Sequence, residues 1–169
     1  MQTYTSKNTS INREKLPAVF RKASFGSRMV MDYGCGKYTD HIRLYMEENH
    51  HAYLPYDPYN QPDDQNAATA TIVCNAMIQR VPVDVVCSNV LNVIDDLVTV
   101  QKIAHHIEQI TTASGGTGYV TVYEGNKSGI GRQTGPDQYQ RNEPLRSYLK
   151  YFSNATIKNG MIVVSSKKC

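Results

Sequence analysis

Short apolar segments alternate with amphipathic segments along most of the chain. Residues 29–33, 52–56, 84–88 and 119–123 are apolar segments bounded by turn residues, a pattern typical of buried strands. Apolar residues recur at helical spacing over 16–23, 40–46 and 97–110, which predicts amphipathic helices there. Thr39 or Asp40 is expected to cap the second helix, and Asp95-Asp96 to open the third.

The segment 61–79 fits two predictions. In the first, the polar residues 61–69 form a loop and Ala70 to Cys74 form a third strand. In the second, one helix covers roughly 64–79.

Turn residues dominate the C-terminal part of the chain. Four glycines and Pro136 fall within 124–141 and predict a long loop. Asn142 is expected to cap a last helix through Phe152, with Pro144 in its first turn. The dipeptide Asn159-Gly160 lies between the β-rich segments 155–158 and 161–165, which predicts a hairpin.

Strands that alternate with helices from residue 29 to residue 123 favour a parallel α/β sheet. We expect a Rossmann-like, doubly wound, mostly parallel sheet in a three-layer sandwich, with a C-terminal antiparallel β-hairpin. A chain of 169 residues is close to the size of one domain. We therefore predict a flexible N-terminal arm over 1–12 and a single domain over 13–169.

Composition narrows the class of protein. Hydrophobic residues make up 40% and charged residues 20%, which argues against a disordered chain, collagen or a coiled coil. No apolar run is long enough for a membrane span, and the N-terminus is too polar for a signal peptide. The net charge of +3 permits a nucleic-acid partner without requiring one.

Cysteine and histidine spacing predicts neither disulfides nor a metal site. The four cysteines, Cys35, Cys74, Cys87 and Cys169, form no CxxC pair, so we expect free thiols and a cytoplasmic location. The histidines occur as the adjacent pairs 50–51 and 105–106, and adjacent helical positions do not face each other. We expect no metal and no membrane contact.

A glycine turn and a distant acid suggest a nucleoside ligand. Gly34 and Gly36 follow the first predicted strand, where the absence of side chains lets a ligand approach the backbone. Asp57 follows the second strand, 21 residues after Gly36, at the spacing of an acid that binds ribose hydroxyls. Taken alone, a tight strand–helix turn and a turn-forming Asp-Pro explain the same residues.

The glycine turn departs from the dinucleotide pattern G-x-G-x-x-G, because Thr39 replaces its third glycine. Asp32, two residues before Gly34, gives instead an acid-x-G-x-G form. This form resembles the glycine motif of S-adenosylmethionine enzymes. Their ligand has no phosphate and carries an ammonium group that a carboxylate such as Asp32 attracts.

The chain resembles class I S-adenosylmethionine-dependent methyltransferases in five segments over roughly 28–125. These are DYGCGKY (32–38), YDPYN (56–60), CNAM (74–77), DVVCSNVLNVIDD (84–96) and GYVTVYEG (118–125). More narrowly, YDPYN, SNVLNVI and VYEG followed by GIGRQT and YQRN resemble small phage-encoded and DNA-phosphorothioation-associated methyltransferases. The resemblance departs at Tyr38, where a glycine is usual, at Asn75, where an acid is usual, and in the short stretch from Asp57 to Asp84.

This resemblance implies S-adenosyl-L-methionine as cofactor and assigns roles to individual positions. Asn89 and Glu124 are the catalytic candidates, because both follow strands at the edge where donor and acceptor meet. Asn92, Arg132, Gln133 and Tyr139 are the substrate-binding candidates, the last three within a substrate loop at 124–141. The cofactor-binding candidates are Asp32, Tyr33, Gly34, Cys35, Gly36, Asp57, Pro58, Tyr59, Asn75, Ala76, Ser88 and Asn89.

Three functions follow as hypotheses. The first is methyl transfer to an unidentified acceptor, either a nucleic acid or a small molecule. The second is an S-adenosylmethionine- or nucleoside-binding module without methyl transfer, such as a sensor or accessory subunit. The third is a nicotinamide-dependent oxidoreductase. Cytosine-C5 chemistry is not expected, because Cys87 follows Val86 rather than a proline, and no oligomeric state is implied.

Overall fold

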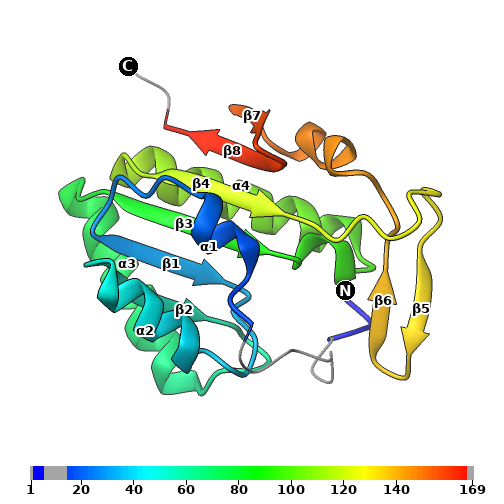
Figure 1. The fold of residues 1–169 in the computed structure, drawn as a ribbon, viewed down its shortest axis with the longest axis horizontal. Coiled ribbons are helices and arrows are strands. Elements are labelled where there is room, and N and C mark those ends of the chain that lie inside the picture. Colours follow the sequence, from blue (N-terminus) through cyan, green and yellow to red (C-terminus); the bar gives the residue numbers. More distant parts are fainter. Residues whose placement is uncertain (1, 6–14, 167–169) are drawn as a thin grey trace.

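The structure is a computed structural model that describes residues 2–5 and 15–166. A six-stranded sheet with the order β2-β1-β3-β4-β8-β7 forms its centre (Figure 1). The parallel strands are β1 (Met29–Tyr33), β2 (Ala52–Tyr56), β3 (Val83–Ser88) and β4 (Thr117–Thr121). At one edge, β8 (Met161–Ser165) runs antiparallel to both β4 and β7 (Ala155–Lys158). The predicted doubly wound sheet with a terminal hairpin is confirmed.

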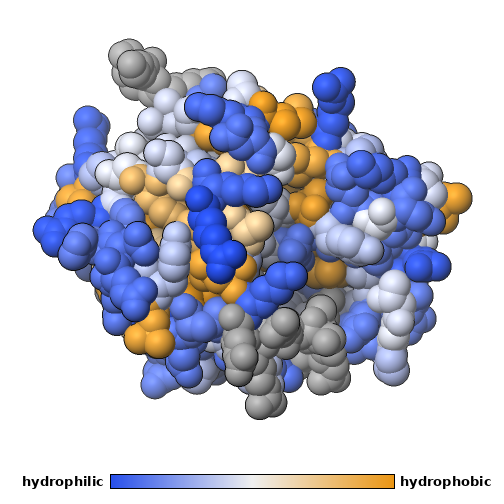
Figure 2. Space-filling model, viewed as in Figure 1, coloured by the Kyte–Doolittle hydropathy of each residue, from blue (hydrophilic) through white to orange (hydrophobic). Residues whose placement is uncertain are grey.

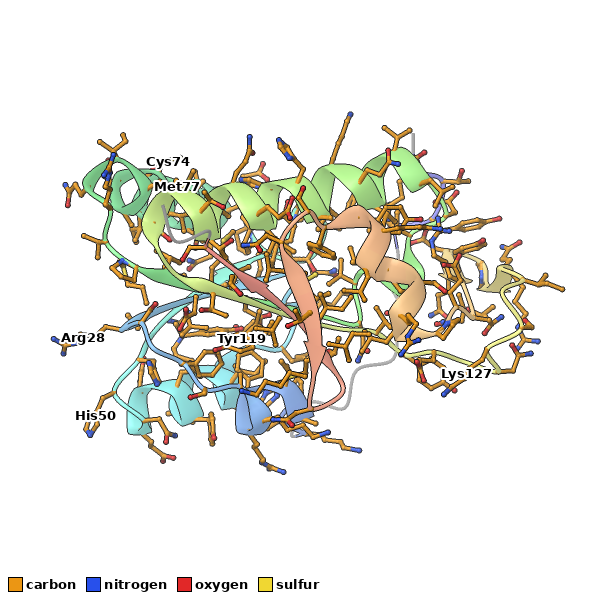
Figure 3. All side chains as sticks on the ribbon, turned by 90° about the horizontal axis from the view of Figure 1, so that it is seen from above. Arg28, His50, Cys74, Met77, Tyr119 and Lys127 are labelled. Atoms are coloured by element: carbon orange, nitrogen blue, oxygen red, sulfur yellow. The ribbon has the colours of Figure 1, made fainter. Side chains whose placement is uncertain are left out.

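Helices cover both faces of this sheet, which gives the predicted three layers. Helices α1 (Ala18–Lys22) and α2 (Asp40–Glu48) pack on one face, where Phe20 and Met46 are buried. Helices α3 (Asp63–Gln79) and α4 (Leu97–Ser114), with the 3-10 helix η2 (Leu145–Tyr151), pack on the other. Figure 3 shows Tyr119 on the side of α1 and α2, and Cys74 and Met77 on α3 on the opposite side.

The segment 61–79 contains one helix, α3, so the predicted loop at 61–69 and strand at 70–74 are wrong. Thr69, Val73 and Ala76 are its buried residues, and their spacing places them on one helical face. The Thr69 hydroxyl donates to the Pro55 carbonyl over 2.8 Å, which fixes α3 against β2. The chain thus passes directly from β2 through α3 to β3.

The segment 124–141 is more ordered than the predicted long loop. It contains an antiparallel pair, β5 (Arg132–Gly135) and β6 (Gln138–Gln140). Arg141, buried beside this hairpin, donates to the Ile94 and Asp95 carbonyls, each over 2.8 Å. These bonds attach the hairpin to the chain just after the 3-10 helix η1 (Leu91–Val93), beyond the carboxyl end of β3.

The last helix is shorter than predicted, and Asn142 does not cap it. It is the 3-10 helix η2, which follows Pro144. Asn142 has a φ of 55° and donates from Nδ2 to the Ile130 carbonyl over 2.9 Å. The Leu145 N–H donates instead to Glu124 Oε1 over 2.7 Å. A remote acid therefore satisfies the N–H group that a local cap was expected to satisfy.

Residues 2–5 of the predicted N-terminal arm contact Asp95 and the β5–β6 hairpin, whereas residues 6–12 lie outside the described part of the chain. The Thr3 N–H donates to the Asp95 carboxylate, and Thr5 bonds to Asp137. Tyr4 stacks on Tyr139 with ring centroids 5.8 Å apart. Within residues 2–5 and 15–166, no helix combines the length and apolar character needed to cross a bilayer.

Candidate functional site

A cleft of about 1200 Å³ opens at the carboxyl ends of the parallel strands. After β1 the chain crosses one face of the sheet through α2, and after β3 it crosses the other face through α4. The gap between β1 and β3 is thus a topological switch point, the place where doubly wound sheets bind ligands. The cleft lies over this gap. Residues that follow β1, β2 and β3 line it, together with residues of α1 and α4.

The turn after β1 packs tightly against the turn after β3. Gly34 has a φ of 80°, and a Cβ built on it would lie 2.4 Å from Cγ2 of Val90. Only glycine adopts this backbone conformation at low cost while leaving room for Val90. The switch point is therefore closed at its base by direct contact between the two turns.

The N–H groups of this glycine turn are all used inside the protein. Gly34 and Cys35 donate to the Tyr56 carbonyl over 2.7 and 3.3 Å. The Gly36 N–H donates to Asp57 Oδ2 over 3.0 Å, and the Gly36 carbonyl accepts from Gln61 over 2.6 Å. A phosphate-binding turn presents free N–H groups to its ligand, and this turn offers none at 34–36.

Asp57 is saturated with hydrogen-bond donors. Its Oδ1 accepts from the Tyr59 and Asn60 N–H groups over 2.9 and 3.0 Å. Its Oδ2 accepts from Gly36 and from Asn60 Nδ2 over 3.0 and 3.1 Å. A carboxylate has about four acceptor positions, and in Asp57 all of them are occupied. Asp57 therefore joins the turn after β1 to the turn after β2.

Asn60 brings an unused acceptor to the wall of the same cleft. Its Nδ2 is bound to Asp57, which fixes the orientation of the amide. Its Oδ1 is buried and has no hydrogen-bond partner among the described residues. Such an orphaned acceptor costs about 1–3 kcal/mol and marks a position where a donor group is missing.

Asp32 is a buried acid at the carboxyl end of β1. It is 3% exposed, and Tyr53 donates its hydroxyl to Oδ2 over 2.6 Å. Burial, with a smaller contribution from the charge of Asp57, raises the pKa of Asp32 to about 7, although the hydrogen bond from Tyr53 acts to lower it. The acid therefore changes charge near neutral pH at the edge of the cleft.

Helix α4 provides a wall of the cleft that the sequence analysis missed. Thr99, Ile103 and His106 line the cleft at the spacing of one helical face, which was the available signal. His106 Nδ1 lies 3.2 Å from the Tyr33 hydroxyl. Burial and the nearby His105 lower the pKa of His106, which favours the uncharged imidazole, and the tautomer of the ring decides whether Nδ1 or the Tyr33 hydroxyl donates.

Most of the predicted cofactor-binding residues meet at the cleft. The ones that line it follow three different strands of the sheet. They are Asp32, Tyr33, Gly34, Cys35, Gly36, Asp57, Pro58, Tyr59, Ser88 and Asn89. Burial raises the pKa of the Cys35 thiol, which keeps it protonated.

Asn75 and Ala76 are not brought to the cleft. Both lie in α3 rather than in a turn after a strand, because the predicted third strand is absent from the described chain. Asn75 is exposed, and Ala76 is buried in the core beneath the helix.

The two catalytic candidates are placed differently. Asn89 is exposed at the cleft with a φ of 57°, and its N–H donates to the Thr121 carbonyl over 2.9 Å. Glu124 does not line the cleft. It accepts from Leu145 N–H and pairs with Lys127 over 2.7 Å, and both interactions hold the pKa of Glu124 below its usual range.

The substrate-binding candidates lie outside the cleft lining. Asn92 is buried, and it donates from Nδ2 to Gln140 Oε1 over 3.1 Å. Arg132 and Gln133 are exposed on β5, and Tyr139 stacks on Tyr4. The hairpin nevertheless contacts the cleft indirectly, because Thr5 both lines the cleft and bonds to Asp137.

No protein-family model, curated protein or solved structure matches this chain. Among the residues that the structure describes, no three His, Cys, Asp or Glu side chains are grouped to hold a metal ion.

Proposed function

We propose that this protein is an S-adenosylmethionine-dependent methyltransferase. One observation carries the proposal: the segments 32–36, 57–59 and 88–89, far apart in sequence, line one cleft at the switch point of the sheet. They belong to the motifs on which the resemblance to this family rests. The antiparallel pair β7–β8 beside β4 agrees with the same resemblance.

The hydrogen bonds of the glycine turn favour a nucleoside without phosphate. Because the N–H groups of residues 34–36 are engaged by Tyr56 and Asp57, a pyrophosphate would find no donors there. This argues against a nicotinamide dinucleotide and in favour of an adenosyl sulfonium.

The residues present fit such a ligand at two points. Asn60 Oδ1 is an acceptor without a donor in the described part of the chain, and a ribose hydroxyl is a donor of the required kind. Asp32 would hold the ammonium of the amino-acid part, directly or through water, and a cation there would favour its ionised form. When bound, the ligand supplies a methyl group on an excellent leaving group.

The protein's main contribution is then to orient the acceptor. Asn89, exposed at the mouth, would hold the acceptor in line with the methyl carbon, which is an effect of proximity and orientation. An acceptor that arrives protonated also requires a base. His106, uncharged at neutral pH and part of the same wall, would take up that proton.

The position of Glu124 favours a second candidate function. With that acid used to fix η2, one of the two catalytic candidates is absent from the cleft lining. A module that binds S-adenosylmethionine without transferring its methyl group has no need of a base.

Calorimetric titration with S-adenosylmethionine, S-adenosylhomocysteine and NAD tests the proposal. We expect micromolar binding of the two adenosyl ligands and none of NAD. Gly36→Val should abolish this binding, because Gly36 has a φ of 74° that valine adopts only with strain. If neither adenosyl ligand binds, the proposal fails.

A further inference from the structure

The cleft is large for a single small ligand. Pockets for a single small molecule usually occupy about 300–1000 Å³, and this one holds about 1200 Å³. The ends of β1, β2 and β3 supply the part assigned above to the donor. Most of the remaining lining comes from residues 15–22, which include α1, and from α4.

This remaining part carries positive charge. The basic residues that line the cleft are Lys15, Arg21, Lys22 and Lys102. All four are exposed, and none forms an ion pair with a residue that the structure describes. The two acids of the lining, Asp32 and Asp57, are buried. Asp32 accepts a hydrogen bond from Tyr53, and Asp57 accepts from the N–H groups of Gly36 and Tyr59. The open part of the cleft lining therefore carries exposed positive charges and no exposed acid.

The positive charges are spread out rather than gathered at one point. Lys15 precedes α1 by three residues and Lys22 ends it, so the two charges come from different parts of this segment and their backbones lie at most about 16 Å apart. Lys102 adds a charge from α4 on the opposite face of the sheet. Figure 2 shows hydrophilic side chains beside hydrophobic surface on the face that carries α1. A single phosphate would meet only part of this arrangement, whereas a chain of phosphates would follow it.

We propose that this part of the cleft binds a strand of single-stranded nucleic acid, so that the methyl acceptor is a nucleotide within a phosphodiester chain. The inference rests on the proposed function, because it assigns the acceptor of that reaction. A single strand is preferred to a duplex, since a base must leave the stack to enter a concave site. Asn89, exposed at the mouth, is the side chain that the entering base would meet.

The test is fluorescence anisotropy with a labelled single-stranded oligonucleotide of mixed sequence, in the presence of S-adenosylhomocysteine and over a series of salt concentrations. Four phosphate contacts predict a slope of about −3 for log K against log salt. Lys22→Glu with Lys102→Glu should weaken binding about tenfold or more and reduce that slope by about 1.4. The matched control, Arg146→Glu with Lys158→Glu, makes the same change in net charge outside the cleft and should stay within about twofold.

Three results would overturn the inference. The first is absence of oligonucleotide binding while S-adenosylhomocysteine still binds, which leaves the donor proposal intact. The second is an equal loss in the cleft variant and in the control, which would assign the binding to net charge. The third is displacement of the oligonucleotide by an equimolar mononucleotide, which would assign the site to a free nucleotide. Absence of S-adenosylhomocysteine binding would instead count against the proposed function.

Discussion

Asp57 holds the turn after β1 through the Gly36 N–H, which donates to its Oδ2 over 3.0 Å across 21 residues of sequence. The same carboxylate accepts from Tyr59 and Asn60, so it fixes the turn after β2 as well. Asp57 is therefore a positioning residue for the floor of the cleft. Its carboxylate reaches a ligand hydroxyl only by giving up one of these bonds.

Replacing Asp57 should therefore cost stability as well as binding. Asp57→Ala leaves four donor groups without their acceptor, and we expect a loss of about 3 kcal/mol in the free energy of unfolding, measured by urea denaturation. Asp63→Ala, an exposed acid at the start of α3, is the control and should cost under about 1 kcal/mol. Equal stability of the two variants would contradict the positioning role.

Asn60 should determine selectivity for ribose. If its Oδ1 accepts from a ribose hydroxyl, Asn60→Ala lowers the affinity for S-adenosylhomocysteine about tenfold and changes the affinity for the corresponding deoxyribose analogue much less. Calorimetry with both ligands on both proteins gives a coupling free energy, which we expect to be about 1 kcal/mol. A coupling of zero, with adenosyl binding intact, would remove Asn60 from the ribose site.

The buried acid Asp32 should make stability depend on pH. The pKa of Asp32 is raised from 3.8 to about 7, so between these values the folded protein binds more protons than the unfolded chain. The contribution of Asp32 to the free energy of unfolding is then present in full below about pH 4 and is lost as the pH rises through about 7. Asp32→Asn should remove this loss. We expect its free energy of unfolding to exceed that of the wild type by about 1–4 kcal/mol at pH 8 and to differ little at pH 4.

Urea denaturation of both proteins at the two pH values measures this effect. Asp63→Asn is the control, because Asp63 is exposed. A gain for Asp32→Asn of the same size at pH 4 and pH 8 would show that titration of Asp32 is not the cause.

The close packing of the two turns should make Gly34 intolerant of a side chain. Gly34→Ala combines a positive φ with a Cβ 2.4 Å from Val90, and we expect a cost of about 2–4 kcal/mol in thermal or urea unfolding. Gly129→Ala is the matched control, since Gly129 has a φ of 72° and open space around it, and it should cost about 1 kcal/mol. Adding Val90→Ala to Gly34→Ala should recover the part of the stability loss that comes from the clash with Val90, but not the part that comes from the positive φ. If Gly34→Ala and Gly129→Ala cost the same, the contact with Val90 contributes nothing.

Local patterns were sufficient to predict most of the elements. The apolar run 29–33 and the helical stripe from Leu97 to Ile110 depend only on residues that are neighbours in the sequence. At 61–79 the same kind of pattern was ambiguous, because Ala70 to Cys74 is apolar enough for a strand while Thr69, Val73 and Ala76 also fit one helical face. Packing of that face on the sheet stabilises the helix rather than the strand.

Membership of the site was less predictable than the elements. Residues directly after strands, such as Gly34, Asp57 and Asn89, were found because the ends of parallel strands meet at one edge of the sheet. Glu124 also follows a strand, yet its carboxylate points to Leu145 and Lys127. His106 lies in the middle of a helix and lines the cleft. The bond from Leu145 to Glu124 is a long-range contact that spacing along the chain does not encode. Helical spacing groups His106 with Thr99 and Ile103, but only the packing of α4 shows that this face lines the cleft.

The sequence by itself determined the alternation of strands and helices, the glycine turn and the acid that follows the second strand, because each is a local property of the backbone and its side chains. Only the tertiary structure decided which hydrogen bonds those residues make. It directed all four acceptor positions of Asp57 to the protein and left Asn60 Oδ1 without a donor among the described residues. It also placed cations of α1 and α4, which pair with no described acid, along one cleft. The physical reason is that a polar group takes its partner from whatever packing brings within about 3 Å, wherever that partner lies in the sequence.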